Sequence, residues 1–248
     1  MSRVTGIILG IVMVAFGGLL VWSIMQSQAG PLAIDYDQYD AARVIPASES
    51  NGNIGDHVRG NADSAVVLVE YGDMQCAGCG TAMPRVTELK AEYGDRVAFV
   101  FRHFPIQGHP NARAAAAALE SAGLQGYFWE MLETVYANQA LWSGEKGATR
   151  TEVFASMFSN IAPDGDVDRF KNDLGDSNID RKITFDYNIG IKQSGVTATP
   201  SFYVNGNFVD ISQVSGKSSF MEIMRAALDE QLKEAGLPTG PATANTEE

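Results

Sequence analysis

The amino-acid sequence predicts an α/β fold with an inserted helical subdomain, preceded by a single N-terminal transmembrane helix. Three observations lead to this prediction. A strand, a helix and a second strand follow one another between residues 66 and 101. A long stretch of helical pattern then separates these elements from a later pair of strands. Before all of them, residues 4–25 form an uncharged apolar stretch.

The apolar stretch of residues 4–25 is predicted to be a retained signal anchor. At about 1.5 Å per residue, it is long enough to cross a hydrocarbon core of about 30 Å. Residues 1–3, which include Arg3, are expected in the cytoplasm, because three aspartates follow the stretch before the next basic residue. A cleaved signal peptide ending near Ser27-Gln28-Ala29 is the alternative. Either reading exports the rest of the chain, and the first predicts a single-pass protein of the cell membrane.

The exported part divides into three segments by composition. Residues 26–55 are polar, lack periodicity and are predicted to be an extracytoplasmic linker. The folded domain is predicted over residues 56–236, and its helical insertion over about residues 108–195. Residues 237–248 follow a glycine that ends the last helix, so we expect them to form a polar tail.

The first half of the domain is predicted to be a strand–helix–strand unit. Residues 66–71 are rich in valine and read as a strand that is buried on both faces. Helical spacing of apolar residues places a helix from about Cys76 to Tyr93, and residues 97–101 form the second strand. The two strands are expected to be parallel because a helix connects them. A further short strand is expected near residues 57–59.

The second half begins with the helical insertion and ends with a hairpin and a helix. Residues 112–122 are rich in alanine, and apolar stripes at helical spacing follow. So long a helical stretch is too large for a simple crossover between strands. Asn205-Gly206 lies between alternating apolar residues, which indicates a type I′ hairpin. An apolar face from Phe220 to Leu232 predicts the final helix.

Composition excludes some classes of function. The formal net charge is −12 and no run of basic residues occurs, so nucleic-acid binding has no support. The chain has two cysteines, Cys76 and Cys79, which is too few for a disulfide scaffold of this length. No metal site is predicted, because the three histidines, His57, His103 and His109, lack the spacing of zinc ligands.

The two cysteines lie just after the first buried strand, at the start of the helix that follows it. Free backbone N–H groups and the positive end of the helix dipole favour a thiolate at this position. Cys76 is therefore expected to be the exposed nucleophile with a lowered pKa, and Cys79, one turn later, the buried resolving thiol. Redox chemistry is favoured over a static disulfide or half of a metal site.

Three motifs together carry a resemblance to a known family. They are Glu70-x5-Cys76, Cys76-x-x-Cys79 and Val196-x-x-Thr199-Pro200. With the helical insertion, they resemble the DsbA-like thiol-disulfide oxidoreductases of the thioredoxin superfamily, in particular the membrane-anchored forms of Gram-positive bacteria. The resemblance covers about residues 56–235 and implies an enzyme with a thioredoxin-like fold.

The resemblance also implies roles for other residues. Thr199 and Pro200 would bind an extended substrate peptide beside the cysteines, through a cis peptide bond. Glu70 would be a buried acid that relays the proton of Cys79; the alternative is a charge at the edge of the sheet. No cofactor is implied beyond the redox-active Cys76–Cys79 disulfide. The implied partners are exported proteins with thiols or disulfides and a membrane oxidase of the DsbB or VKOR type.

The residues between the cysteines depart from the family pattern. Ala77-Gly78 supplies no cation, so the helix terminus alone must stabilise the Cys76 thiolate. Arg102 is a candidate to balance Glu70, whereas His103 is expected to have a packing or surface role.

Three functions follow in order of preference. The first is an oxidase that introduces disulfides into exported proteins. The second is a reductase or isomerase of the same fold, including one for cytochrome maturation. The third is a membrane-anchored chaperone or binding module with a structural disulfide. The direction of electron flow is left open by the sequence.

Overall fold

The computed structural model describes residues 34–212 and 217–241. The predicted membrane anchor at residues 4–25 lies outside these ranges, as does the end of the predicted tail. Within residues 34–212 and 217–241, no helix combines the length and the apolar character needed to cross a bilayer.

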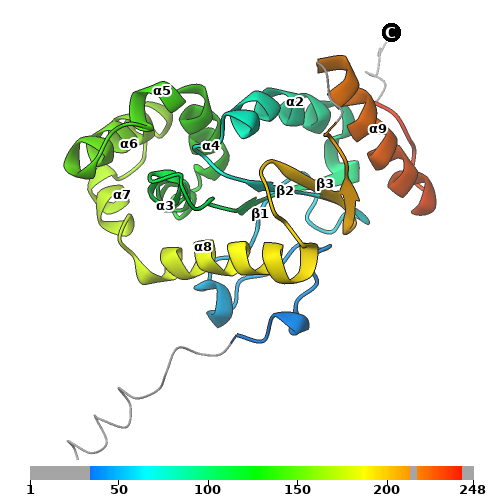
Figure 1. Cartoon of the computed structure of the whole chain (residues 1–248), viewed down its shortest axis with the longest axis horizontal. Coiled ribbons are helices and arrows are strands. Elements are labelled where there is room, and N and C mark those ends of the chain that lie inside the picture. The colour runs from blue at the N-terminus through cyan, green and yellow to red at the C-terminus, as the bar shows by residue number, and fades with distance from the viewer. Residues whose placement is uncertain (1–33, 213–216, 242–248) are drawn as a thin grey trace, which may run out of the picture. The chain divides into compact units, whose positions relative to one another are not determined.

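A five-stranded sheet forms the centre of the domain (Figure 1). Its strand order is β1-β3-β2-β4-β5. Strands β2 and β3 are parallel, as predicted, and each other neighbouring pair is antiparallel. Every residue of β2 is buried, which places the strand that precedes the cysteines at the core of the sheet. The strands are β1 (His57–Arg59), β2 (Val66–Gly72), β3 (Val97–His103), β4 (Ser201–Val204) and β5 (Asn207–Val209).

The helices cover both faces of the sheet and form a bundle beside it (Figure 1). Helices α2 and α9 lie over one face, and α8 lies over the other. The inserted helical subdomain runs from α3 to α8, and its helices α3 to α7 share an apolar core with α2 and β3. The helices are α2 (Ala77–Tyr93), α3 (Ala112–Gly123), α4 (Phe128–Ala137), α5 (Gln139–Trp142), α6 (Gly147–Ile161), α7 (Val167–Asp173), α8 (Ser177–Ile189), the π-helix η4 (Gly190–Ser194) and α9 (Lys217–Glu234).

The hairpin between β4 and β5 confirms the type I′ prediction. Asn205 and Gly206 both have positive φ, at 47° and 81°. Only residues that tolerate this region of φ fit both positions of the turn. The Asn205 side chain also accepts a hydrogen bond from the Val67 backbone N–H, at 2.9 Å, so the turn is fastened to β2.

The prediction that residues 26–55 form a linker is wrong from Tyr36 onward. Tyr36, Ile45 and Ile54 are buried, and the segment belongs to the same compact unit as the rest of the domain. The Gln193 side chain donates to the Tyr39 carbonyl at 2.7 Å and accepts from the Ala41 N–H at 2.9 Å. Single apolar anchors and backbone hydrogen bonds leave no periodic pattern, so the sequence resembled a tether.

Candidate functional site

The two cysteines occupy the first turn of α2. Cys76 is the N-cap residue, with extended backbone angles, and its side chain is partly buried. Cys79 is fully buried, one turn later. Both are free thiols. A partly buried thiol at the helix terminus is therefore followed, one turn later, by a thiol that solvent does not reach.

The Cys76 thiol has a pKa lowered to about 5. The largest cause is a hydrogen bond from the Cys79 thiol; burial opposes it, and Thr199 and the backbone N–H groups of Gly78 and Cys79 add to the lowering. Hydrogen bonds to the charged form favour that form. With a pKa below neutrality, Cys76 favours the thiolate, which the Cys79 thiol and the backbone N–H groups of Gly78 and Cys79 stabilise.

Thr199 and Pro200 lie beside the cysteines, although more than 100 residues separate them in sequence. Their peptide bond is cis. The Cys76 Sγ–H donates to the Thr199 carbonyl at 3.4 Å. A Cβ at Gly78 would stand 3.4 Å from Pro200 Cδ, so the loop packs closely on the start of α2. The structure therefore brings together the cysteine pair and the predicted peptide-binding residues.

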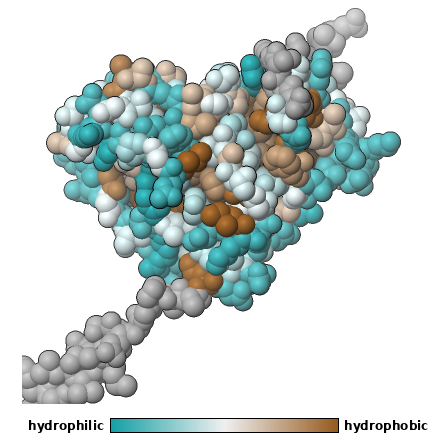
Figure 2. Space-filling view, in the orientation of Figure 1, coloured by the Kyte–Doolittle hydropathy of each residue, from teal (hydrophilic) through white to brown (hydrophobic). Residues whose placement is uncertain are grey.

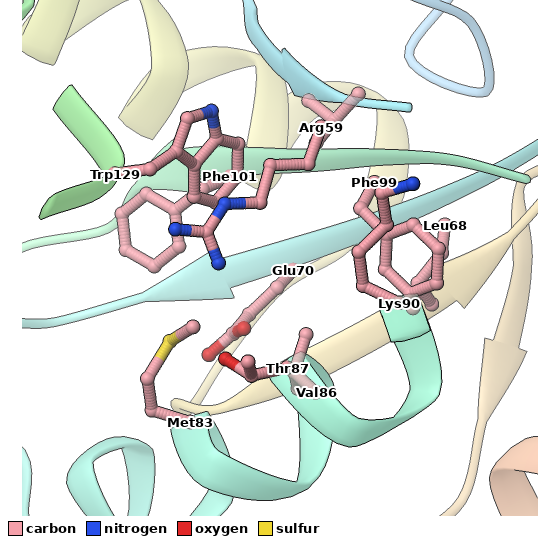
Figure 3. Close-up of a pocket in the computed structure, with 11 residues that line it drawn as sticks. Arg59, Leu68, Glu70, Met83, Val86, Thr87, Lys90, Phe99, Phe101 and Trp129 are labelled. Atoms are coloured by element: carbon pink, nitrogen blue, oxygen red, sulfur yellow. The ribbon is translucent and has the colours of Figure 1, made fainter. Parts of the chain in front are cut away.

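Glu70 lies beneath the active site, on β2. It is 3 % exposed, and its Oε1 has no hydrogen-bond partner. Figure 3 shows its carboxyl group pointing toward α2, near Met83 and Thr87. Burial, and next the negative charge of Cys76, raise its pKa to about 8. Glu70 is therefore a buried acid that holds its proton at neutral pH.

A small cavity adjoins Glu70 and separates it from the rim of the domain. The space open to the centre of a water molecule is about 10 Å³, which suits about one water. Arg59 and Trp129 stand on the far side of this cavity from Glu70 (Figure 3). A water at this position would give the unpartnered carboxyl oxygen a route for proton exchange.

Cys79 has a pKa raised well above its usual range. Its hydrogen bond to Cys76 is the main cause, followed by burial and by the negative charge of Glu70. Tyr136 of α4, also buried, has a raised pKa, caused mainly by burial and then by Cys79 and Glu70. Cys79 therefore holds its proton tightly, and the charges of Glu70 and Cys79 affect one another.

Arg102 does not form an ion pair with Glu70, so this candidate pairing is wrong. In the parallel register, Glu70 lies opposite Phe101, and Arg102 is the next residue along β3. Consecutive residues of a strand point to opposite faces of the sheet. Arg102 accordingly reaches the other face, where it donates to Asp56 Oδ2 at 2.7 Å.

The three histidines lie away from the cysteines. His103 is buried, with its Nε2 2.8 Å from Glu120 Oε1, in the packing role expected of it. His57 Nε2 lies 2.9 Å from the other oxygen of Glu120. His109 Nδ1 lies 2.8 Å from Asp73 Oδ2.

Two contacts with the active-site turn were not predicted from the sequence. The Tyr136 hydroxyl donates to the Asp73 carbonyl at 3.4 Å, and Gln139 donates to the Met74 carbonyl at 2.7 Å. Tyr136 read as one more apolar position of a helix stripe. Gln139 follows shortly after that stripe. A polar residue just beyond the end of an apolar helix face was the sequence signal that could have indicated its contact with the turn.

Curated relatives match only part of their own length. The chain is 40 % identical over 183 residues to a Na(+)/H(+) antiporter NhaA 1 of Salinispora arenicola, covering 67 % of this chain and 26 % of that protein. It is 36 % identical over 157 residues to an NhaA 1 of Mycolicibacterium vanbaalenii, covering 61 % and 23 %. The chain therefore spans about a quarter of the length of these relatives.

Solved structures share the fold. BdbD from Bacillus subtilis in its oxidised form has a TM-score of 0.60 at 19 % identity, covering 77 % of this chain and 98 % of that chain. α-DsbA1 of Wolbachia pipientis has a TM-score of 0.57 at 20 % identity, covering 73 % and 94 %. DsbA2 of Pseudomonas aeruginosa has a TM-score of 0.53 at 26 % identity, covering 69 % and 93 %.

The family model described as Thioredoxin matches residues 52–230, which include the cysteine pair, the helical insertion and the cis-proline loop. With this match, the fold and the arrangement of the motifs, the chain belongs to the thioredoxin family and is a DsbA-like member of that superfamily.

Proposed function

We propose that this protein is an oxidase that introduces disulfide bonds into exported proteins. A substrate thiolate attacks Cys76 Sγ, the Cys76–Cys79 bond breaks, and a mixed disulfide forms between substrate and Cys76. Glu70 gives its proton to the departing Cys79 sulfur. A second substrate thiolate then attacks the substrate sulfur of the mixed disulfide and releases the Cys76 thiolate. The substrate loses two electrons, and the cysteine pair of this protein gains them.

The lowered pKa of Cys76 is the observation that supports this direction. A stabilised thiolate favours the reduced form of the pair, and this makes its disulfide a stronger oxidant. The Cys76 pKa of about 5 lies below the value of about 7 in thioredoxin and above about 3.5 in DsbA. The helix terminus, Cys79 and Thr199 together supply this stabilisation, although no cation lies between the cysteines.

The location of the reaction and its partners are part of the same proposal. The apolar residues 4–25 would anchor the protein, with residues 1–3 in the cytoplasm and the domain outside. Disulfides persist in that compartment. A membrane oxidase of the DsbB or VKOR type would reoxidise the cysteine pair after each turnover.

The surface of the domain favours an enzyme over a chaperone. In Figure 2, apolar groups on this face gather in small separate patches and not in one continuous surface. A binding module for unfolded chains would need an extended apolar patch. Large apolar side chains that are well exposed in the described residues come from distant parts of the chain: Leu124, Leu141, Ile191 and Phe208.

Trapping with the full-length protein tests the roles of the cysteines. Reduced Cys79→Ser, incubated with a protein disulfide, should accumulate a mixed disulfide on non-reducing gels, because the trapped sulfur has no resolving partner. Cys76→Ser should trap nothing and should lose all exchange activity. Trapping through Cys79 alone would contradict the assignment, and so would the retention of exchange activity by both variants.

A second assay tests the direction of electron flow. The oxidised protein is mixed with a reduced, unfolded substrate, and in parallel the reduced protein is mixed with insulin. Faster formation of substrate disulfide than reduction of insulin supports the oxidase. The opposite order would favour the reductase or isomerase.

A further inference from the structure

The active-site turn is held by a side chain of the inserted helical subdomain. The Gln139 amide, at the start of α5, donates through Nε2 to the Met74 carbonyl at 2.7 Å and to the Cys76 carbonyl at 3.0 Å. These carbonyls belong to the residues on either side of Gln75. One amide therefore bridges two peptide groups of the turn that leads into α2. Figure 1 shows the insertion helices α4 and α5 beside α2.

The Cys76 carbonyl that Gln139 holds is also the first acceptor of the helix. The Gly80 N–H donates to it at 3.2 Å, which closes the first helical turn. The backbone N–H groups of Gly78 and Cys79, which favour the Cys76 thiolate, lie within this same turn. A contact that fixes the direction of the Cys76 carbonyl therefore also fixes the N–H groups that face the sulfur.

The side chain of Gln75, which lies in the turn itself, also forms hydrogen bonds with the insertion. The Gln75 side chain donates to the Ser143 carbonyl at 3.0 Å and accepts from the Asn111 N–H at 2.8 Å. The Asn111 side chain donates to the Ser143 and Glu145 carbonyls, each at 2.8 Å. The insertion thus binds the turn through several side chains, and among these contacts the Gln139 amide is the one that reaches the Cys76 peptide itself.

We propose that Gln139 is a positioning residue for thiol–disulfide exchange: its amide fixes the Cys76 peptide so that the first turn of α2 keeps its N–H groups directed at the Cys76 sulfur. This rests on the proposed function only in taking Cys76 as the reacting sulfur. It gives the inserted subdomain a direct effect on cysteine reactivity.

Gly80 provides a second view of the same contact. A Cβ at this position would stand 3.0 Å from Gln139 Oε1 and 3.3 Å from its Cδ. An alanine would therefore push the amide away from the turn by a few tenths of an ångström. Alanine also favours a helix over glycine. Gly80→Ala should disturb the position of Gln139 without loosening α2.

The test is a titration of Cys76 in the reduced full-length protein, followed by the ultraviolet absorbance of the thiolate. Gln139→Met keeps the length of the side chain and removes both donated hydrogen bonds. We expect the Cys76 pKa to rise by about one unit, with roughly tenfold less thiolate at pH values below the midpoint. The other titratable groups near this sulfur are Cys79, Glu70 and, behind them, Tyr136; all three have raised pKa values and titrate later.

Gln125→Met is the matched control. Gln125 is also half-buried, and its amide makes two hydrogen bonds with the Asp166 backbone, at 3.0 and 2.9 Å, in a loop of the insertion. It is remote from the cysteines in the fold, so its replacement should leave the Cys76 titration unchanged.

The outcomes separate cleanly. A folded Gln139→Met protein with an unchanged Cys76 titration would overturn the proposal. If that variant does not fold, Gly80→Ala decides: a raised Cys76 pKa with undiminished thermal stability supports the positioning role, and an unchanged pKa overturns it. The titration needs no substrate. If the exchange assays contradict the oxidase proposal, the result for Gln139 therefore still holds, and the two failures can be told apart.

Discussion

The two faces of the central sheet bury acids in opposite ways. On the face covered by α8, Asp56 lies between two cations, with its oxygens 2.7 Å from Arg102 and 3.1 Å from Lys182. On the face covered by α2, Glu70 is equally buried, and its Oε1 has no hydrogen-bond partner (Figure 3). The domain thus carries a paired acid on one face of the sheet and a lone acid on the other.

The pKa values follow from this difference in partners. Burial alone would raise both, but Arg102 and Lys182 lower the pKa of Asp56 to about 2. Glu70, which has no such neighbour, has its pKa raised to about 8. Pairing therefore decides whether a buried acid stabilises the fold or exchanges a proton. Three predictions test this contrast.

The largest effect on stability is expected when the paired acid, Asp56, loses its charge. Asp56→Asn leaves Arg102 buried without its carboxylate partner, whereas Lys182 keeps its ion pair with Asp186 at 2.8 Å. Loss of one partner of a buried ion pair costs about 3–5 kcal/mol of unfolding free energy. Urea denaturation at pH 7 measures this loss. The Cys76 titration should not change, because Asp56 lies across the sheet from the cysteines.

Asp180→Asn is the matched control for this variant. Asp180 also pairs with an arginine, Arg113, at 2.7 Å, but both side chains are substantially exposed. Exposed pairs contribute less than about 1 kcal/mol. Equal losses in the two variants would show that the buried network does not stabilise the fold as described.

Glu70, the unpaired acid, should make the stability of the folded protein depend on pH. Between its ordinary pKa of 4.5 and its folded value of about 8, Glu70 keeps a proton that the unfolded chain has lost. Stability therefore falls as pH rises through this window, by up to about 1.4 kcal/mol per pH unit, and is flat on either side of it. Glu70→Gln removes this contribution, so it should gain about 3 kcal/mol relative to the parent between pH 5 and pH 8.

Denaturation of both reduced proteins across that pH range measures the gain. The same substitution should slow exchange and alter its pH dependence, because Cys79 loses its proton partner. If the unfolding free energies of the parent and Glu70→Gln differed by the same amount at every pH, Glu70 would titrate normally. An exchange rate with an unchanged pH profile would eliminate the relay.

The smallest effect is expected at the rim of the cavity beside Glu70. Arg59 pairs with Glu133 and lies 4.8 Å from the centre of the Trp129 ring, and its side chain is partly exposed. Burial and Cys76, not Arg59, account for the raised pKa of Glu70. Arg59→Met should cost less than about 1 kcal/mol and leave the pH window of Glu70 in place. A shift of that window would identify Arg59 as the missing partner of Glu70.

The sequence predicted the part of the fold that depends on periodic or local signals. The buried strand, the cysteine helix, the parallel second strand and the Asn205-Gly206 turn all appear in the structure. Each has a short-range cause: an apolar pattern or a special φ. The resemblance to the family, not a local signal, implied the cis bond before Pro200 and placed Thr199 and Pro200 beside the cysteines.

The sequence did not predict contacts that depend on tertiary placement. Arg102 and Glu70 looked like partners because both lie in apolar strands, but the register sends them to opposite faces. Residues after Tyr36 looked like a linker because their bonds to Arg102 use the Ala41 and Arg43 carbonyls, which carry no residue signature. The position of Gln139 after an apolar stripe marked it as a candidate contact but did not show its partners, because these are two backbone carbonyls.

The reduction potential of the Cys76–Cys79 pair in the full-length protein tests the central claim most directly. Equilibration against glutathione measures it. A Cys76 pKa about two units below that of thioredoxin should raise the potential by about 60 mV from thioredoxin's value of about −270 mV. We therefore predict a value of about −210 mV or less negative, toward the −120 mV of DsbA. A value at or below about −270 mV would contradict the oxidase and place the protein among reductases.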